Sequence, residues 1–161
     1  MEFKIIPGYD QTEILKPLFI QYTDRLVAAD PSFADYLRVQ NYDEELADLN
    51  AKYGPPAGRL YLALTEDGQR RGCIAMKKID RDSCEMKRLY VKEQYRGEGL
   101  GEKLARLLID RRREAGYKTM LLDTLPFLQP AIALYEKLGF TRTEIYNNSP
   151  MDTSIFMKLE L

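Results

Sequence analysis

Three glycines in one short loop, at positions 97, 99 and 101, constrain this chain more than any other feature of its sequence. The loop joins a strand-like run that ends at Val91 to an amphipathic pattern that begins at Leu100. Backbone without Cβ atoms at the start of a helix is free to turn several N–H groups toward one point, where the helix dipole also favours negative charge. The loop therefore predicts a strand, a phosphate-binding turn and a helix in direct succession.

The hydrophobic period changes repeatedly along the rest of the chain, as it does in proteins that mix strands and helices. Strands are expected at 2–6, 60–65, 72–79, 83–91, 119–123, 140–146 and 155–159. Helices are expected to begin near 10, 43, 100 and 130, the first of them with a capping box formed by Asp10 and Glu13. Each helix is expected to end before one of the breakers Asp30-Pro31, Gly54-Pro55-Pro56, Gly116 and Gly139.

The strand before the glycine loop changes its phase. Cys84 and Met86 share one parity, whereas Leu89 and Val91 share the other. Because successive side chains of a strand point to opposite faces, this change predicts a β-bulge near 87–88, with burial of both faces as the alternative.

The order of the elements predicts the sheet. A strand, the glycine loop, a helix and the strand 119–123 make a βαβ unit, which requires one parallel strand pair. The connection 66–69 suits a hairpin, so the neighbouring strands are expected to be antiparallel. We therefore expect an α/β fold with a mixed sheet, in a single domain that spans 1–161.

Composition excludes several classes of function. A net charge of −1 does not support sequence-independent nucleic-acid binding, and no run approaches the ~20 apolar residues of a membrane span. We expect a cytoplasmic protein, monomeric or homodimeric, without nucleic-acid or membrane partners. The chain has no histidine, and Cys73 and Cys84 have no partners at metal-ligand spacing. No metal is therefore expected, and acid or base chemistry must use carboxylates, tyrosine, lysine, cysteine or water.

The glycine spacing excludes the two common nucleotide motifs. The four-residue spacing and the Gly-Lys-Ser/Thr of a P-loop are absent, and so is the Gly-x-Gly-x-x-Gly of a Rossmann fold. Arg96-x-x-Gly99-x-Gly101, followed about thirty residues later by the run 131–140 (AIALYEKLGF), instead resembles the GNAT superfamily of acetyl-CoA-dependent N-acetyltransferases. The resemblance implies a twisted, mostly antiparallel sheet of about seven strands with a splayed parallel pair, flanked by about four helices.

The resemblance also implies where the co-substrate acetyl-CoA would bind. Backbone groups of the strand before the loop would pair with the pantetheine, and N–H groups of the loop would hold the pyrophosphate, with Glu98 pointing to solvent. Many members have an Asn at the position of Leu128, and Gln129 is expected to replace it if the loop is shifted by one residue. Lys137 is carried over as a further contact. The expected cofactor-binding residues are Leu89, Tyr90, Val91, Arg96, Gly97, Glu98, Gly99, Leu100, Gly101, Gln129 and Lys137.

Two residues are expected to carry the chemistry. An alkyl amine of pKa ~10.4 must lose a proton before it attacks, and Glu85 stands eleven residues before Arg96, where some family members place a base. Glu85 paired with a cation such as Lys87 on an exposed strand face is the alternative. Tyr135 is expected to protonate the departing thiolate, and a packing role beside Leu134 and Leu138 is its alternative. Attack would be direct, in a ternary complex.

The sequence leaves the acceptor and two competing functions open. The amine acceptor is a small amine, an antibiotic, an amino acid or a protein N-terminus, and it is expected to enter beside the first two helices and the loop 147–151. Asp30, Asp35, Tyr36 and Asp43 lie on that side and would attract a cationic amine. The competing functions are a non-catalytic CoA-binding sensor and a nucleotide-binding enzyme for ATP or NAD.

Overall fold

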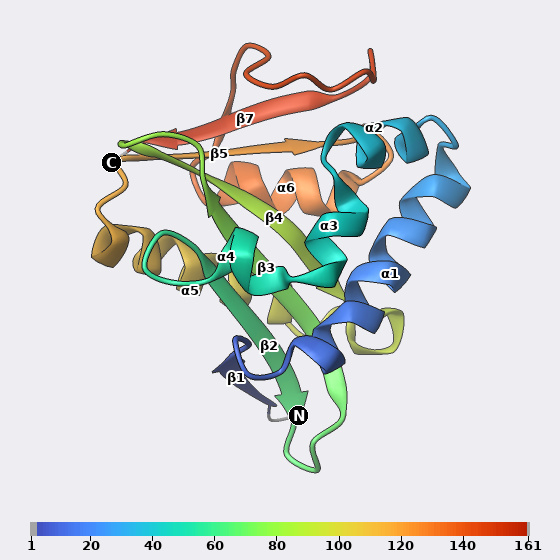
Figure 1. The fold of residues 1–161 in the computed structure, drawn as a ribbon, viewed down its shortest axis with the longest axis vertical. Coiled ribbons are helices and arrows are strands. Elements are labelled where there is room, and N and C mark those ends of the chain that lie inside the picture. The colour runs from blue at the N-terminus through green and yellow to red at the C-terminus, as the bar shows by residue number, and fades with distance from the viewer. Residues whose placement is uncertain (1–2, 161) are drawn as a thin grey trace.

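The computed structural model describes residues 3–160, and Figure 1 shows their arrangement. The strands are β1 (Phe3–Pro7), β2 (Arg59–Thr65), β3 (Arg70–Lys78), β4 (Ser83–Val91), β5 (Thr119–Thr124), β6 (Thr141–Arg142) and β7 (Ile155–Glu160). The α-helices are α1 (Thr12–Ala29), α2 (Phe33–Val39), α3 (Tyr42–Ala47), α4 (Leu49–Tyr53), α5 (Leu100–Ala115) and α6 (Gln129–Lys137), and a 3₁₀ turn covers Glu93–Tyr95. Glu2, where the first strand was expected to begin, lies outside the described residues.

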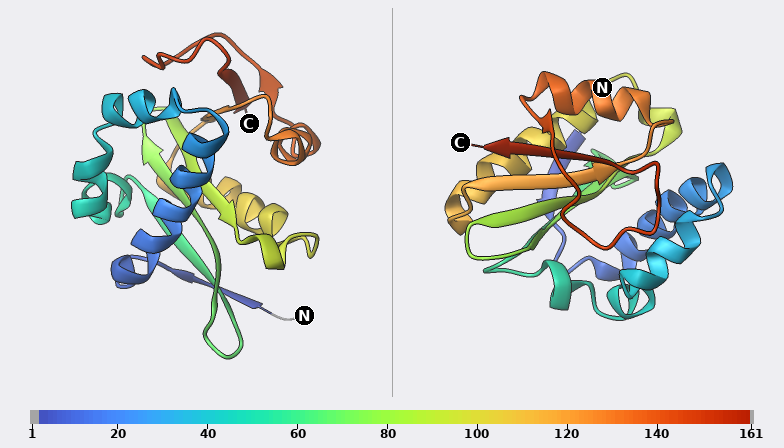
Figure 2. Two further views of the ribbon diagram at one scale, coloured as in Figure 1. Left: turned by 90° about the vertical axis from the view of Figure 1, so that its right-hand side faces the viewer. Right: turned by 90° about the horizontal axis from the view of Figure 1, so that it is seen from above.

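The seven strands form one mixed sheet in the order β1-β2-β3-β4-β5-β7-β6. Within residues 3–160, β4 and β5 alone pair in parallel, as the βαβ prediction requires, and the other neighbours are antiparallel. Helices α1 to α4 cover one face of the sheet, and α5 and α6 cover the other (Figure 2). Both faces of the central strands are consequently buried, so β3 is buried continuously from Arg71 to Met76.

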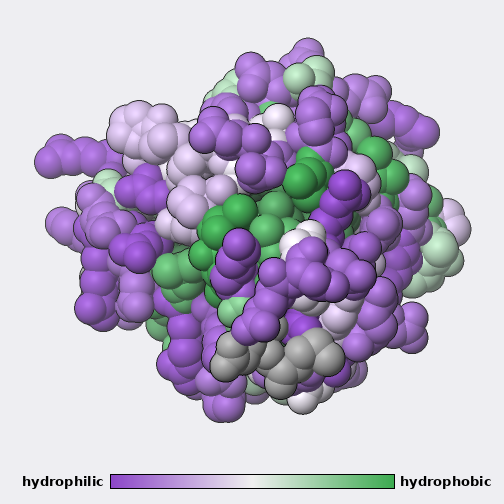
Figure 3. Space-filling model, turned by 90° about the horizontal axis from the view of Figure 1, so that it is seen from below, coloured by the Kyte–Doolittle hydropathy of each residue, from purple (hydrophilic) through white to green (hydrophobic). Residues whose placement is uncertain are grey.

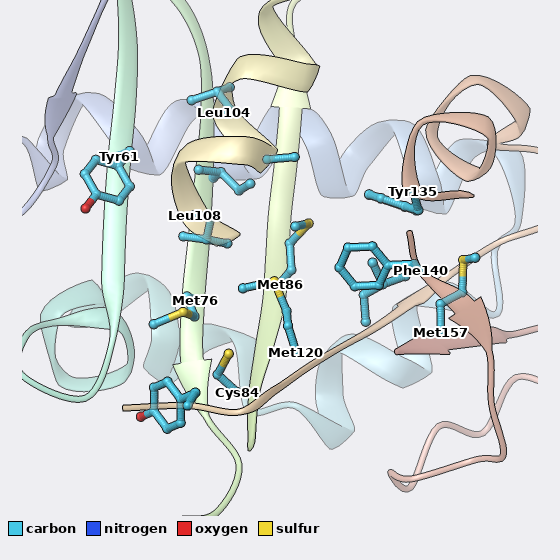
Figure 4. Packing of buried hydrophobic residues seen from close by; sticks show 14 of the residues in the cluster. Tyr61, Met76, Cys84, Met86, Leu104, Leu108, Met120, Tyr135, Phe140 and Met157 are labelled. Carbon is cyan, nitrogen blue, oxygen red and sulfur yellow. The ribbon is translucent and has the colours of Figure 1, made fainter. Parts of the chain in front are cut away.

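Two hydrophobic clusters hold the helices on the sheet. The larger lies on the α5 and α6 side, and Figure 4 shows Tyr135 and Phe140 side by side at its edge. The second joins α1 and α4 to the opposite face through Leu15, Leu18 and Phe19, all with 0% exposure. Each of these buried side chains stabilises the packing by about 1.5–3 kcal/mol relative to exposure. The face of α1 that carries these side chains therefore attaches the helix to the sheet.

The parallel strands separate soon after they meet. Ser83, Cys84 and Glu85 pair with 119–121 of β5, and the two strands form no further pair within the described chain. Two residues later β4 carries the expected bulge, because Tyr90 opposes Cys73 while Lys87 opposes Ala75. Arg88 lies at the bulge with a left-handed φ of 60°. The bulge bends β4 away from β5 and opens the sheet on the side of the glycine loop.

Several local expectations need correction. A helix that was not expected, α2, follows Asp30-Pro31, and the helix expected to begin near 43 and to end before Gly54 is two short helices because Asp48 leaves the helical conformation with φ of −151° and ψ of 86°. The first helix begins at Thr12 without a side-chain cap, so the Asp10 and Glu13 capping box is wrong. The strand expected at 140–146 is limited to Thr141–Arg142, since the following residues leave the sheet to form a long loop.

Figure 3 shows hydrophobic surface gathered in the middle of the face at the bottom of Figure 1, surrounded by hydrophilic side chains. Within residues 3–160, no helix is long and apolar enough to cross a membrane, and no group of three or more metal-ligating side chains forms a metal site.

Candidate active site

The glycine loop presents unused hydrogen-bond donors at the start of α5. Gly97 and Gly99 have φ of 86° and 79°, a left-handed conformation that strains any residue with a Cβ. Within residues 3–160, the N–H groups of 97–102 donate to no side chain and to no carbonyl of a turn or loop. These donors lie at the positive end of the 16-residue helix α5. The turn is therefore built to receive an anion, as its sequence predicts.

A cleft runs from this turn into the split between β4 and β5. It encloses about 1200 Å³ of empty space, part of it open to solvent. One wall is the end of β4 with Leu89, Tyr90 and Val91, and the opposite wall is α6 with Ala131, Leu134 and Tyr135. The cleft has the shape for a long ligand with an apolar middle and an anionic part at the glycine turn.

Most of the expected cofactor-binding residues meet in this cleft. Arg96 lines it, and its Nε donates to the Val91 carbonyl at 3.1 Å, so the guanidinium stays next to the turn. Glu98 faces away from the cleft, as expected, but its carboxylate does not simply point to solvent. It pairs with the buried Arg71 at 3.3 Å, which holds the negative charge away from an anion at the turn.

Two expected contacts have other partners in this structure. The amide of Gln129 donates to the Pro126 carbonyl in its own loop, and the residue is absent from the cleft lining, whereas Leu128 lines the cleft. Lys137 likewise is not part of the lining, because its ammonium pairs with Glu102 at 2.7 Å. An apolar leucine therefore takes the place of the polar contact that the resemblance implied.

Tyr135 stands where the cleft meets a second cavity. Its ring packs edge-on against Phe140 at 5.9 Å, and within the described chain its hydroxyl has no hydrogen-bond partner. Burial, followed by the charges of Tyr22 and Asp123, raises the pKa of Tyr135 well above its usual value, so the hydroxyl stays protonated at neutral pH. Tyr135 is therefore a core aromatic, as in the packing alternative, and the residue also lines both cavities.

The second cavity lies on the α1 and α2 side of the sheet. Its empty space is about 540 Å³, part of it open to solvent, and it adjoins the cleft where the two share the side chains of Tyr22, Leu26, Leu89, Leu128 and Tyr135. We call it the acceptor cavity. Its other walls combine apolar side chains such as Phe33 and Leu122 with the charged side chains of Lys87, Arg88 and Asp123.

Glu85 is not among the residues that line this cavity. The residue is 3% exposed, accepts a hydrogen bond from the Tyr146 hydroxyl at 2.5 Å, and has Lys77 and Lys87 at 3.8 Å. Burial and the charge of Glu85 raise the pKa of Tyr146, so this phenol remains a donor. The pairing with Lys87 that the alternative expected is therefore present, but Glu85 lies in a buried network and not on an exposed strand face.

Asp123 is a carboxylate that sequence reasoning missed. It lies on β5 beyond the last pair with β4, lines the acceptor cavity and accepts hydrogen bonds from Tyr36 and from Asn147 at 3.2 Å. The sequence signal that would have indicated Asp123 is its position at the end of a strand, next to the point where the parallel strands separate. Of the acidic side expected from sequence, Tyr36 alone lines the cavity, while Asp30 and Asp35 hydrogen-bond within their own surface segments.

Buried ions also line the acceptor cavity at the bulge. Arg88 makes a bidentate pair with Glu45, at 2.9 and 3.0 Å, and both side chains are almost fully buried. Burial alone would raise the pKa of Glu45, but Arg88 and Lys52 lower it to about 2. Burial, and then the charge of Arg88, lowers the pKa of Lys87 to about 8. The bulge thus directs two consecutive cations toward the same face of the sheet.

A sheet that opens between its parallel strands and ends at free helix N–H groups defines a class of α/β proteins that hold an extended anionic ligand between strands. The family model of the acetyltransferase (GNAT) family matches residues 24–140, and the chain belongs to this family. It is therefore an acyltransferase by family. An N-acetyltransferase of Schizosaccharomyces pombe is 43% identical over 126 residues, covering 78% of this chain and 77% of the relative.

Solved structures confirm the predicted fold. A GNAT-family acetyltransferase of Staphylococcus aureus superposes with a TM-score of 0.77 over 99% of both chains, at 20% identity. A GNAT-family acetyltransferase of Elizabethkingia anophelis, solved with acetyl-CoA bound, has a TM-score of 0.68 at 24% identity and covers 99% of this chain and 98% of its own. The mixed sheet of about seven strands with a splayed parallel pair is therefore confirmed.

Proposed function

We propose that this chain transfers an acetyl group from acetyl-CoA to a primary amine by direct attack in a ternary complex. The observation that carries the proposal is the junction of two cavities at Tyr135: a long cleft that ends on free N–H groups, and a smaller cavity lined by a carboxylate. A bound acetyl-CoA supplies a thioester carbonyl to an acceptor nitrogen. Holding both reactants on one platform removes most of the entropy cost of their encounter.

The residues of the cleft fit the donor. The glycine turn, with Arg96 beside it, would hold the pyrophosphate, and Arg25 lines the same cleft as a second cation. The edge of β4 that faces the split would pair with the pantetheine amides at 89–91. Glu98 would not repel the phosphates, since its carboxylate is held on Arg71.

Proton transfers are assigned to three side chains. The ammonium of the acceptor gives a proton to a base. A carbon–nitrogen bond then forms, the carbon–sulfur bond breaks, and the departing thiolate takes up a proton. Tyr135, protonated and at the junction, would be the acid. Glu85 would be the base through the Tyr146 hydroxyl and a water, and Asp123 is the second candidate because it lines the acceptor cavity directly.

The assignment of the base is testable by two isosteric variants. Glu85→Gln is expected to lower kcat by about 100-fold at pH 7, since general bases contribute roughly 10²–10⁴. The measurement is release of the CoA thiol with a panel of amines, and Glu114→Gln, at an exposed ion pair with Arg111, is the matched control. Full activity of Glu85→Gln together with loss in Asp123→Asn would move the base to Asp123. Acetyl-CoA binding without transfer to any amine would instead favour a non-catalytic CoA sensor.

A second test concerns the glycine turn. Gly99→Ala is expected to weaken acetyl-CoA binding about tenfold, because the left-handed backbone costs a residue with a Cβ roughly 1–2 kcal/mol and the N–H groups lose their direction. Gly68→Ala is the matched control: Gly68 has φ of 85° in the β2–β3 turn, and a Cβ there, as at Gly99, meets nothing within 4 Å. Calorimetric titration with acetyl-CoA measures both. Equal affinity of the two variants would contradict the proposed role of the turn.

A further inference from the structure

Lys87 and Arg88 converge on one neutral oxygen in the acceptor cavity. Lys87 Nζ donates to Gln40 Oε1 at 2.5 Å, and Arg88 Nη2 donates to the same oxygen at 2.7 Å. Gln40 is the residue that follows α2, and all three side chains line the cavity. A single amide oxygen therefore lies between two buried cations.

The two cations differ in how their charge is balanced. Arg88 has the carboxylate of Glu45 in a bidentate pair, whereas the nearest carboxylate oxygen to Lys87 is that of Glu85, at 3.8 Å. That oxygen is shared, since Lys77 stands at the same distance from it. The Lys87 side chain is only 5% exposed, so water does little to stabilise its charge. A buried ammonium in this state gains most from an anionic partner at hydrogen-bond distance.

An amide oxygen is a poor substitute for such a partner. A carboxylate places a full negative charge beside the cation, whereas an amide oxygen places only a partial one, so a buried cation is stabilised more by the carboxylate. The lining of the same cavity also includes the Asp123 carboxylate, which suits an ammonium, and apolar side chains such as Phe33 and Leu122. The charges of the cavity thus match a molecule with a cationic and an anionic end.

We propose that the oxygen of Gln40 occupies the place of a substrate carboxylate, and that the acceptor is an amino acid, bound by its carboxylate between Lys87 and Arg88. This inference rests on the proposed acetyl transfer, because it names the acceptor of that reaction. On binding, the carboxylate would displace the amide of Gln40 and direct the amine toward Asp123 and Tyr135. Amines without an anionic group would leave the two cations with the neutral oxygen.

Direct binding to the CoA-loaded protein tests the inference independently of turnover. Calorimetry compares α-, β- and γ-amino acids with the matching amines that lack the carboxylate, for example L-leucine with 3-methylbutylamine. The best amino acid is expected to bind about 10–100-fold more tightly than its matching amine, the range that charged hydrogen bonds provide. Absence of amino-acid binding, or equal affinity for every pair, would overturn the proposal.

Three variants identify the contacts. Lys87→Met is expected to remove the preference for the carboxylate, and Gln40→Glu to weaken amino-acid binding at least tenfold, because a resident carboxylate competes for the same cations. Lys4→Met, at an exposed position of β1, is expected to keep the preference. Retained acetyl-CoA affinity shows that each variant is folded. A preference that survives both Lys87→Met and Gln40→Glu would also overturn the proposal.

The outcomes separate this inference from the proposed function. Acetylation of carboxylate-free amines as fast as amino acids would leave an N-acetyltransferase and remove the amino-acid acceptor. Carboxylate-dependent binding without acetylation of any amine would retain the site between Lys87 and Arg88 and remove the transfer reaction.

Discussion

Replacing Tyr135 by phenylalanine is expected to lower kcat by about 100-fold, while the affinity for acetyl-CoA stays within about twofold of wild type. The reason is that the hydroxyl would act on the leaving thiolate and not on the bound donor. The ring, which packs on Phe140, is retained, so the α6 packing survives. Steady-state thiol release gives kcat, and calorimetry gives the acetyl-CoA dissociation constant.

The control for this variant is a buried tyrosine elsewhere in the same cluster. Tyr117 is 4% exposed, belongs to the larger hydrophobic cluster and donates its hydroxyl to the Ala57 carbonyl at 2.7 Å. Tyr117→Phe is expected to lose about 1 kcal/mol of unfolding free energy and to keep kcat. Undiminished kcat in Tyr135→Phe would remove the general acid from the mechanism and leave Tyr135 as a packing residue.

Breaking the ion pair at the bulge is expected to have the largest effect on stability. Glu45→Gln leaves Arg88 buried without its bidentate carboxylate, and removal of one partner of a buried pair typically costs about 3–5 kcal/mol. Glu13→Gln removes the ion pair between Glu13 and Lys16, in which the Glu13 side chain is 86% exposed. That control is expected to change the unfolding free energy by less than about 1 kcal/mol. Urea unfolding measures both variants.

The same pair predicts the direction of an acid effect. The pKa of Glu45 is about 2 in the folded protein, below its ordinary value of 4.5, so the pair stabilises the fold fully above pH 4.5. This contribution is lost progressively as the pH falls from 4.5 toward 2. The stability difference between wild type and Glu45→Gln is expected to shrink by about 2 kcal/mol from pH 5 to pH 3. A difference that stays constant over this range would show that Glu45 is not held ionised by Arg88.

Sequence patterns predicted the elements that depend on neighbours along the chain. The parity change in β4 predicted the bulge because side-chain alternation is a property of a single strand, and the bulge is where Arg88 has a positive φ. The strand expected at 140–146 was overestimated since pairing with β7 extends only over Thr141 and Arg142. Pairing partners, in contrast to periodicity, are a property of the whole fold.

The donor side of the candidate site could be predicted largely from local sequence, but its polar exceptions could not. Gln129 was expected to replace an asparagine, yet its amide donates to Pro126, so an uncharged leucine at 128 lines the cleft. The backbone conformation before α6 determines whether the side chain at 128 or at 129 faces the cleft. Residue type alone does not indicate that direction.

By itself, the sequence determined the glycine turn at the start of a helix and the acetyltransferase family of this chain, because glycine conformations and helix periodicity act over a few neighbouring residues. Only the tertiary structure decided the composition of the acceptor cavity. The side-chain oxygen of Gln40 accepts a hydrogen bond from Lys87, which is 47 positions away in the sequence. Asp123 accepts one from Tyr36, which is 87 positions away. Contacts of that separation form only when α2, the bulge of β4 and the end of β5 pack together. The physical reason is that packing buries Lys87 and Arg88. Buried charges need an anionic partner because they are removed from water.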